Sequence, residues 1–297
     1  MQDTSTPSPR IIVIKLGGAA DVSHEAALQD IVRLRAGGAS VIVVHGGSAE
    51  ADRLGVDVGH PAQKLISPGG HESRHTDPRT LELFVMATAL VNRRTVGALQ
   101  AAGTNAFGLS GLDGALLRGR RKGALRTVEN GRVRIVRDDW SGRIESVDGD
   151  LCRTLLDAGL TPVVAPLAMT AAGEPLNVDG DRAAAAVASA VGASELVFLT
   201  GANGLYASFP DPASRIERAG SAVFDQLLGF AQGRMKRKVI ASQEAIEAGV
   251  PRVAIATAAG ASPISAALAG EGTIITRDPA VEPALEPLVK TAGEPAL

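Results

Sequence analysis

The sequence predicts an α/β protein built on one open, mainly parallel sheet. The 297 residues are 45% hydrophobic and only 3% aromatic, a composition that suits helices packed on a buried parallel sheet better than an aromatic-rich sandwich. Apolar runs alternate with helical stretches along most of the chain, and two of the early runs end in glycine pairs. The length allows one large core or two modest ones.

The first part of the chain has two strand–helix units. They are a strand over 11–16, a helix over 24–35, a strand over 41–45 and a long helix over 78–102. Glycine follows both helices, as is common where a helix ends. Successive parallel strands joined in this way are expected to have right-handed crossovers.

The alternation is interrupted between about residues 116 and 147. Residues 126–129 and 132–136 alternate polar and apolar side chains around Asn130-Gly131, which predicts a tight β-hairpin. Because both faces of this ribbon carry polar residues, we expect it to protrude from the main sheet.

The parallel pattern resumes after the hairpin. The expected elements are a helix over 148–158, a strand over 161–165, a helix over 181–191, a strand over 195–199, a helix over 234–248, a strand over 253–256 and a helix over 262–269. We infer a sheet wound in two halves within one domain over 10–276. The Ser-, Thr- and Pro-rich residues 1–9 and the Pro-rich residues 277–297 are expected to be disordered tails.

Composition excludes several classes of protein. A net charge of −2 gives no global basic field for nucleic acid or an anionic membrane, and no run of about 18 uncharged apolar residues is present. Cys152 is the single cysteine, which excludes an internal disulfide and fits a reducing compartment. We expect a cytoplasmic protein in which Cys152 is a packing residue rather than a nucleophile.

Two strand ends carry the first candidate site. Lys15 stands before the pair Gly17–Gly18, and a second pair, Gly46–Gly47, follows the strand over 41–45. Glycine lets backbone N–H groups approach an anion and lysine supplies positive charge, so two such turns predict a phosphate site. Each motif alone also fits an ordinary strand-to-helix turn. Neither a Walker A loop nor a clean G-x-G-x-x-G is present.

Two later segments add charge. A loop ending in Asp181 precedes an alanine-rich helix, and one of its carboxylates is expected to cap that helix. Lys236, Arg237 and Lys238 lie near the start of another helix, where the helix dipole disfavours cations. The cluster therefore predicts a bound anion such as phosphate, with a solvated basic face as the alternative.

Five motifs occur in a fixed order: K-x-G-G, H-G-G, S-R-x-T-D, N-x-D-x-D and G-x-M-x-x-K. Over residues 10–276 this set resembles the amino acid kinase family, in its N-acetylglutamate kinase-like branch. The resemblance implies a three-layer αβα sandwich with a substrate-binding half over about 10–175 and an ATP-binding half over about 176–276. It also implies a homodimer, and transfer of the ATP γ-phosphoryl group to a side-chain carboxylate, with Mg²⁺ carried by the nucleotide and no metal site of the protein's own.

The same resemblance assigns roles to individual residues. By this resemblance, Lys15 and Lys238 would neutralise the transferred phosphoryl group, and Asp181 would hold both ammonium groups. For the substrate, Gly46 and Gly47 would offer backbone N–H groups, Arg74 would bind the α-carboxylate and Asn177 would bind the group on the amine. The phosphates or nucleotide would be bound by Gly17, Gly18, Thr200 and Lys236. A carboxylate acceptor is already ionised at neutral pH and needs no general base. Charge compensation should therefore carry most of the catalysis, and we interpret His45 as a turn or hydrogen-bonding residue rather than a proton shuttle.

Two departures point to one branch of the family. Ser48 stands where a third glycine is usual, and a basic run, Arg118, Arg120, Arg121 and Lys122, lies beside the predicted hairpin. These features resemble the branch that phosphorylates α-aminoadipate while its amine is attached to the small acidic carrier protein LysW, in lysine biosynthesis. The basic run would then contact the acidic carrier. Salt screening limits charge attraction to about 8 Å, so these cations can attract only a partner that comes close to them.

Several alternatives stay open at this point. The substrate could be carrier-bound glutamate, which differs by one methylene, or free N-acetylglutamate in arginine biosynthesis. Another carboxylate or carbamate kinase and an amino-acid-sensing module on the same fold are further options. The basic run could equally be a solvated hairpin without a partner.

Overall fold

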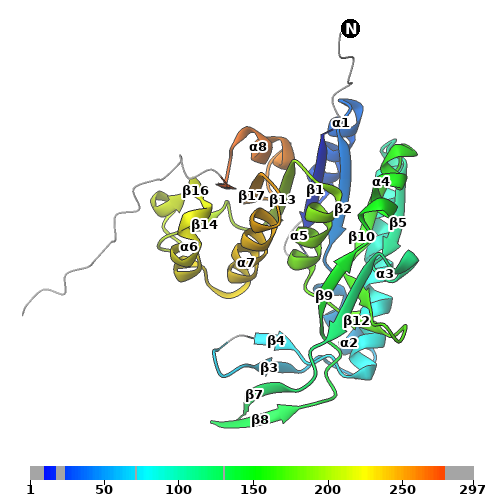
Figure 1. Cartoon of the computed structure of the whole chain (residues 1–297), viewed down its shortest axis with the longest axis vertical. Coiled ribbons are helices and arrows are strands. Elements are labelled where there is room, and N and C mark those ends of the chain that lie inside the picture. The colour runs from blue at the N-terminus through cyan, green and yellow to red at the C-terminus, as the bar shows by residue number, and fades with distance from the viewer. Residues whose placement is uncertain (1–9, 18–23, 71, 130, 278–297) are drawn as a thin grey trace, which may run out of the picture.

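The computed structural model describes residues 10–17, 24–70, 72–129 and 131–277 (Figure 1). Gly18 and almost all of the two predicted tails lie outside these residues.

The centre of the molecule is an eight-stranded sheet (Figure 1). In spatial order its strands are β16 (Arg218–Gly220), β18 (Thr273–Thr276), β17 (Arg252–Thr257), β13 (Glu195–Thr200), β1 (Ile11–Leu16), β2 (Ser40–His45), β10 (Thr161–Ala165) and β5 (Ala106–Ser110). All neighbours are parallel except β17 and β18. The predicted mainly parallel sheet is therefore confirmed.

Helices cover both faces of this sheet and make the predicted three layers. They are α1 (Glu25–Ala36), α2 (Ser48–Asp57), α3 (Pro78–Ala101), α4 (Gly149–Asp157), α5 (Gly180–Val191), α6 (Phe224–Phe230), α7 (Gly233–Glu247) and α8 (Pro263–Ala269). One core lies under α4, α5, α6 and α7 and includes Val13 of β1. The other lies under α1, α3 and α8 and includes Ile12 and Ile14. Successive strand residues thus enter opposite cores, which is why β1 is continuously apolar from Ile11 to Ile14.

A second, four-stranded sheet replaces the simple interruption that the sequence predicts. Its order is β12 (Pro175–Asn177), β11 (Leu167–Met169), β6 (Leu117–Arg121) and β9 (Gly142–Val147). The predicted hairpin, β7 (Leu125–Glu129) with β8 (Arg132–Val136), leaves this sheet between β6 and β9. The sequence did not reveal the second sheet because three-residue strands such as β11 and β12 are too short to show periodicity.

Another hairpin, β3 (Lys64–Ile66) with β4 (Glu72–Arg74), lies beside the first at one end of the molecule (Figure 1). The two are joined by Thr127, whose hydroxyl group accepts from the Ile66 N–H at 3.2 Å and donates to the Ile66 carbonyl at 3.2 Å. A small ribbon of β14 (Leu205–Tyr206) and β15 (Arg215–Ile216) completes the strands described.

Cys152 lies in α4 and is fully buried in the first core. Burial raises the pKa of its thiol to about 11, so the side chain is a packing residue, as predicted. None of the helices in the described part of the chain has the length and apolar character needed to cross a bilayer.

Candidate active site

The carboxyl ends of four neighbouring strands of the main sheet meet at one edge. In register, Lys15 of β1 lies between Val44 of β2 and Phe198 of β13, and Thr200 of β13 pairs with Thr257 of β17. Both predicted glycine turns follow these strands directly. This is the edge of an open parallel sheet where ligands bind.

Three charged side chains from distant parts of the sequence meet just beyond this edge. Lys15 Nζ lies 2.8 Å from Asp181 Oδ1, and Lys238 Nζ donates to Asp181 Oδ1 at 3.1 Å and Oδ2 at 2.9 Å. The three residues are only 6%, 6% and 7% exposed for Lys15, Asp181 and Lys238. The structure therefore brings together the three residues that the sequence assigns to catalysis, as one buried bridge.

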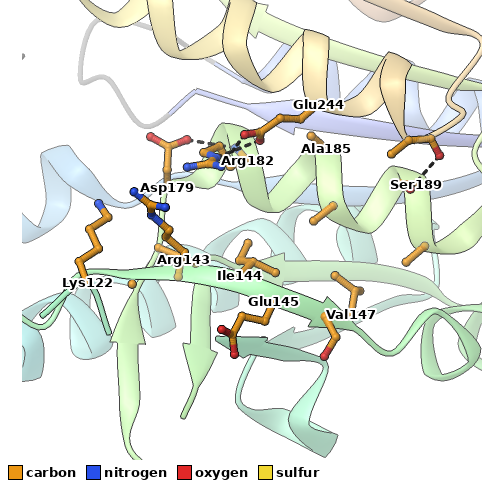
Figure 2. A pocket seen from close by; sticks show the side chains of 16 residues that line it. Lys122, Arg143, Ile144, Glu145, Val147, Asp179, Arg182, Ala185, Ser189 and Glu244 are labelled. Atoms are coloured by element: carbon orange, nitrogen blue, oxygen red, sulfur yellow. Dashed lines mark hydrogen bonds and ion pairs between the residues drawn. The ribbon is translucent and has the colours of Figure 1, made fainter. Parts of the chain in front are cut away.

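Helix caps place these groups. Asp179 is the N-cap of α5 and accepts from the backbone N–H groups of Asp181 and Arg182, so the next carboxylate, Asp181, is free to face the lysines. Arg182 in turn donates to Glu244 of α7 (Figure 2), with Nε 2.9 Å from Oε2. This exposed pair adds a contact between α7 and α5, which pack against each other in the first core.

Electrostatics in the bridge favour an incoming anion. Burial alone would raise the pKa of Asp181, but the two ammonium groups outweigh it and hold that pKa far below its usual range. Desolvation lowers the pKa of Lys238, and the Asp181 carboxylate partly opposes that shift. With both lysines protonated, two ammonium groups and one carboxylate leave one net positive charge in a buried place, which a phosphoryl group would compensate.

The second glycine turn differs from the prediction in one respect. The Gly46 N–H donates to the Leu16 carbonyl at 3.1 Å, so it is not available to a ligand. Within the part of the chain that the structure describes, the Gly47 N–H has no protein acceptor, and Gly47 is the N-cap of α2. A Cβ atom on Gly47 would lie 2.5 Å from Thr88 Cγ2 of α3, which explains the need for glycine there.

The predicted substrate residues lie where three segments meet. Arg74 forms an ion pair with Asp52 at 2.6 Å and donates to the Ser48 carbonyl at 3.2 Å. Asn177 Nδ2 donates to the Thr76 hydroxyl at 2.9 Å, and the buried Asp139 accepts from the Thr76 N–H at 2.8 Å. Sequence reasoning missed Asp139, whose only signal is an acidic pair before the single tryptophan.

The predicted nucleotide-binding residues are placed at the same edge of the sheet with less detail. Thr200 ends β13, and Lys236 is half-buried in the first turn of α7, two residues before Lys238. The Gly17 carbonyl accepts from His24 Nε2 at 2.8 Å. Among the described residues no group of three or more His, Cys, Asp or Glu side chains could hold a metal ion.

The structure divides the predicted basic run. Arg121 points inward, where its guanidinium group donates to the Arg137 and Asp139 carbonyls, both at 2.7 Å, and lies 4.2 Å from the centre of the Trp140 ring. Arg120 is exposed and pairs with Glu145 at 2.9 Å. Arg121 therefore secures the base of the hairpin, and its contact with a carrier stays a prediction.

The remaining two cations of the run occupy different places. Arg118 is exposed on β6. Lys122 lies at one end of a cavity of about 400 Å³ between β9 and α5, on the same side as Arg143 and Asp179 (Figure 2). Asp179 and Arg182, at the start of α5, line this cavity, whereas the three bridge residues are not part of its lining.

Comparison with known proteins identifies the class. Residues 10–257 match the model of the amino acid kinase family. The chain belongs to this family.

Particular relatives are more informative. The chain is 46% identical to LysW-aminoadipate kinase of Thermus thermophilus, over 89% of this chain and all of that protein. It is 43% identical to LysW-aminoadipate kinase of Deinococcus radiodurans, over 90% of this chain and 91% of that protein. Among solved structures, N-acetylglutamate synthase from Neisseria gonorrhoeae is similar with a TM-score of 0.74 and 25% identity, over 91% of this chain and 60% of that one.

Proposed function

We propose that this protein uses ATP to phosphorylate the side-chain carboxylate of α-aminoadipate while the substrate's amine is attached to the acidic carrier protein LysW. The product is an acyl phosphate in lysine biosynthesis. The observation that carries the proposal is the buried bridge of Lys15, Asp181 and Lys238, because its net positive charge suits a phosphoryl group in transfer. The two LysW-aminoadipate kinases with over 40% identity support the choice of substrate.

The residues of the bridge act by charge and position. The acceptor carboxylate and the phosphoryl group are both anionic and must approach within about 3.5 Å. Lys15 and Lys238 offset their repulsion, and Asp181 keeps the two ammonium groups at fixed distances from each other. The Gly47 N–H adds a donor at the next strand end. No side chain has to take a proton, since the acceptor is already ionised.

The same site suits ATP as the donor. Gly17, Thr200 and Lys236 lie at or near the sheet edge beside the bridge, and glycine turns with lysines are typical phosphate ligands. Mg²⁺ would be held mainly by the phosphates, as is usual for this ion. Bound there, it would withdraw charge from the transferred group.

Arg74 and Asn177 are the proposed substrate ligands. Arg74 is held near the start of α2 by Asp52 and Ser48, where a guanidinium group could bind an α-carboxylate through two parallel hydrogen bonds. Asn177 is oriented by Thr76 and could bond the acyl group on the substrate amine. These contacts would let the site distinguish an amino acid with an acylated amine from one with a free amine.

The two hairpins form the proposed carrier surface. Arg126 and Arg132 are exposed on β7 and β8, and Val133 and Ile135 are exposed by 58% and 53%. Lys64 lies on the neighbouring β3. An acidic carrier with some apolar surface would fit this mixed basic and apolar face. Arg118, Arg120 and Lys122, which lie on or directly after β6, are the further proposed carrier contacts.

The family resemblance also leads us to propose a cytoplasmic homodimer. Met86 and Leu90 of α3 and Phe107 of β5 are exposed by 48%, 39% and 45%, and a second copy could cover them. Sedimentation analysis of the purified protein would test this part of the proposal.

The decisive experiment compares acceptors in an assay of ADP release with ATP and Mg²⁺. We expect turnover with α-aminoadipate on the carrier and little with free N-acetylglutamate. Carrier-bound glutamate should be used less well by about fourfold, since one buried methylene contributes about 0.8 kcal/mol. Turnover on free N-acetylglutamate alone would move the protein to arginine biosynthesis, and a ligand-dependent thermal shift without any ADP would identify a sensor.

A further inference from the structure

A buried histidine and asparagine lie behind the Gly46–Gly47 turn and take no part in the chemistry described above. His45 ends β2 and is 2% exposed, and Asn92 of α3 is 3% exposed. Asn92 Nδ2 lies 3.1 Å from His45 Nε2, 2.7 Å from the Val163 carbonyl and 3.3 Å from the Leu109 carbonyl. Two buried side chains are thus held together at the strand ends next to the site.

These contacts determine which nitrogen of His45 carries the proton. The two carbonyl oxygens accept from Asn92, so its NH₂ group, and not its oxygen, faces them and the imidazole. An amide nitrogen donates and does not accept, so a proton on His45 Nε2 would face the Asn92 NH₂ group without an acceptor. The Gly46 carbonyl can only accept, so the proton lies on Nδ1, which donates to it at 2.8 Å. Burial, with Lys15 and His24 nearby, lowers the pKa of His45 to about 4, so the ring stays neutral near pH 7.

This hydrogen bond fixes the direction of the next N–H group. The Gly46 carbonyl and the Gly47 N–H belong to one planar trans peptide and point in opposite directions. His45 holds the carbonyl from behind, and the Gly46 N–H is held by the Leu16 carbonyl at 3.1 Å. The Gly47 N–H is thereby directed away from the imidazole and away from its hydrogen-bonded neighbours.

We propose that His45 and Asn92 are positioning residues that aim the Gly47 N–H at the phosphoryl or acceptor oxygen during transfer. The inference rests on the proposed function. Without the Nδ1–H donor the Gly46–Gly47 peptide could rotate, since glycine restricts its neighbours little. Rotation would replace an N–H donor by a carbonyl oxygen facing two anions, which disfavours the transition state more than substrate binding.

The test uses two substitutions of one residue. His45→Leu removes the donor, and we expect kcat on the carrier-bound substrate to fall between about 10-fold and 100-fold, with KM for ATP changed by less than about threefold. His45→Asn keeps an N–H donor near the position of Nδ1 and should recover most of kcat. A merely structural histidine would give two variants that lose activity in proportion to their loss of stability in urea, and that result would overturn the proposal.

Thr161→Val provides a matched control, because Thr161 is a fully buried polar residue at the opposite, amino-terminal end of β10. It should leave kcat unchanged. Nitrogen-15 NMR of histidine-labelled wild-type protein adds a readout without turnover: His45 should be the neutral Nδ1–H form from pH 6 to 8, and an Nε2–H form would overturn the proposal. If the wild-type protein is inactive on every acceptor, the proposed function is overturned and the positioning role with it. If the wild type is active and the His45→Leu variant is equally active, only the positioning role is overturned.

Discussion

Two ion pairs of equal length show how differently this protein uses charge. Lys238 Nζ lies 2.9 Å from Asp181 Oδ2 in the buried bridge, and Arg120 Nε lies 2.9 Å from Glu145 Oε1 on the second sheet. Both side chains of the first pair are 8% exposed, whereas those of the second are 72% and 52% exposed. Water screens the exposed pair and weakens its attraction. The buried charges have lost their hydration, and only their attraction to each other offsets that cost. Burial rather than distance therefore distinguishes the charges of the bridge from those on the surface.

Among the substitutions that test this difference between buried and exposed charges, Asp181→Asn should have the largest effect on stability. It leaves two buried ammonium groups without a carboxylate, and we expect the free energy of unfolding at pH 7 to fall by about 3–5 kcal/mol and activity to be lost. Urea unfolding monitored by circular dichroism measures this. An Asp181→Asn protein as stable as the wild type would contradict the role of Asp181 as the counter-ion.

The pH dependence of the same variant follows from the lowered pKa of Asp181. A carboxylate whose folded pKa lies below its unfolded value stabilises the fold above about pH 4, and this contribution is lost as pH falls toward the folded pKa. The stability difference between wild type and Asp181→Asn should therefore shrink below pH 4 and stay constant between pH 6 and 8.

Lys15→Met and Lys238→Met test the other side of the bridge. Each leaves one lysine with Asp181, a neutral pair, so we expect a much smaller loss of stability than in Asp181→Asn. The kcat should fall by at least about 100-fold, because the missing charge matters most in the transition state. Steady-state kinetics and urea unfolding of the same preparations separate the two effects, and equal turnover in a folded variant would refute the catalytic role.

Reversal of exposed charge should give a moderate, salt-dependent effect. Arg126→Glu with Arg132→Glu changes the hairpin face without touching the bridge, and we expect KM for the carrier-bound substrate to rise about tenfold at low salt and less at 0.5 M salt. KM for ATP should not change. Arg218→Glu on β16, at the far edge of the main sheet, is the matched control, and a similar rise in that variant would show that the hairpins are not specific.

The smallest expected effects on stability come from alanine substitutions of the neighbouring residues Arg120 and Arg121. Arg121→Ala removes two hydrogen bonds to backbone carbonyls and the contact with Trp140, so we expect a loss of about 1–3 kcal/mol in stability. Arg120→Ala removes one exposed pair and should cost less than about 1 kcal/mol. Thermal unfolding of both variants measures the difference, and the reverse order would mean that the hairpin base is held elsewhere.

Much of the fold and the charged part of the site could be predicted from the sequence. Apolar strands of five or six residues bounded by glycine turns are visible without an alignment, and β1, β2, β10, β13 and β17 lie close to where the patterns put them. The basic cluster that opposes its own helix dipole indicated an anion, and Lys238 from that cluster lies in the bridge. Local composition determines these features, so the sequence displays them.

Other features depend on contacts between distant segments. The sequence could not show which carboxylate of 179–181 caps α5 and which faces the lysines, because both occur in the same loop. Nor could it show that the Gly46 N–H is taken by the Leu16 carbonyl, or that Arg121 turns inward onto Trp140. Each outcome depends on what a neighbouring strand or loop presents.

The sequence by itself determined the class of fold, the order of its main strands and helices, and the presence of lysines and glycines suited to phosphate. Only the tertiary structure decided that Lys15, Asp181 and Lys238 form one buried bridge, that the hairpins lie side by side, and that His45 is held by Asn92. The physical reason is that periodicity and turn chemistry act within a few residues, whereas burial, desolvation and hydrogen-bond direction are set by segments tens to hundreds of residues apart.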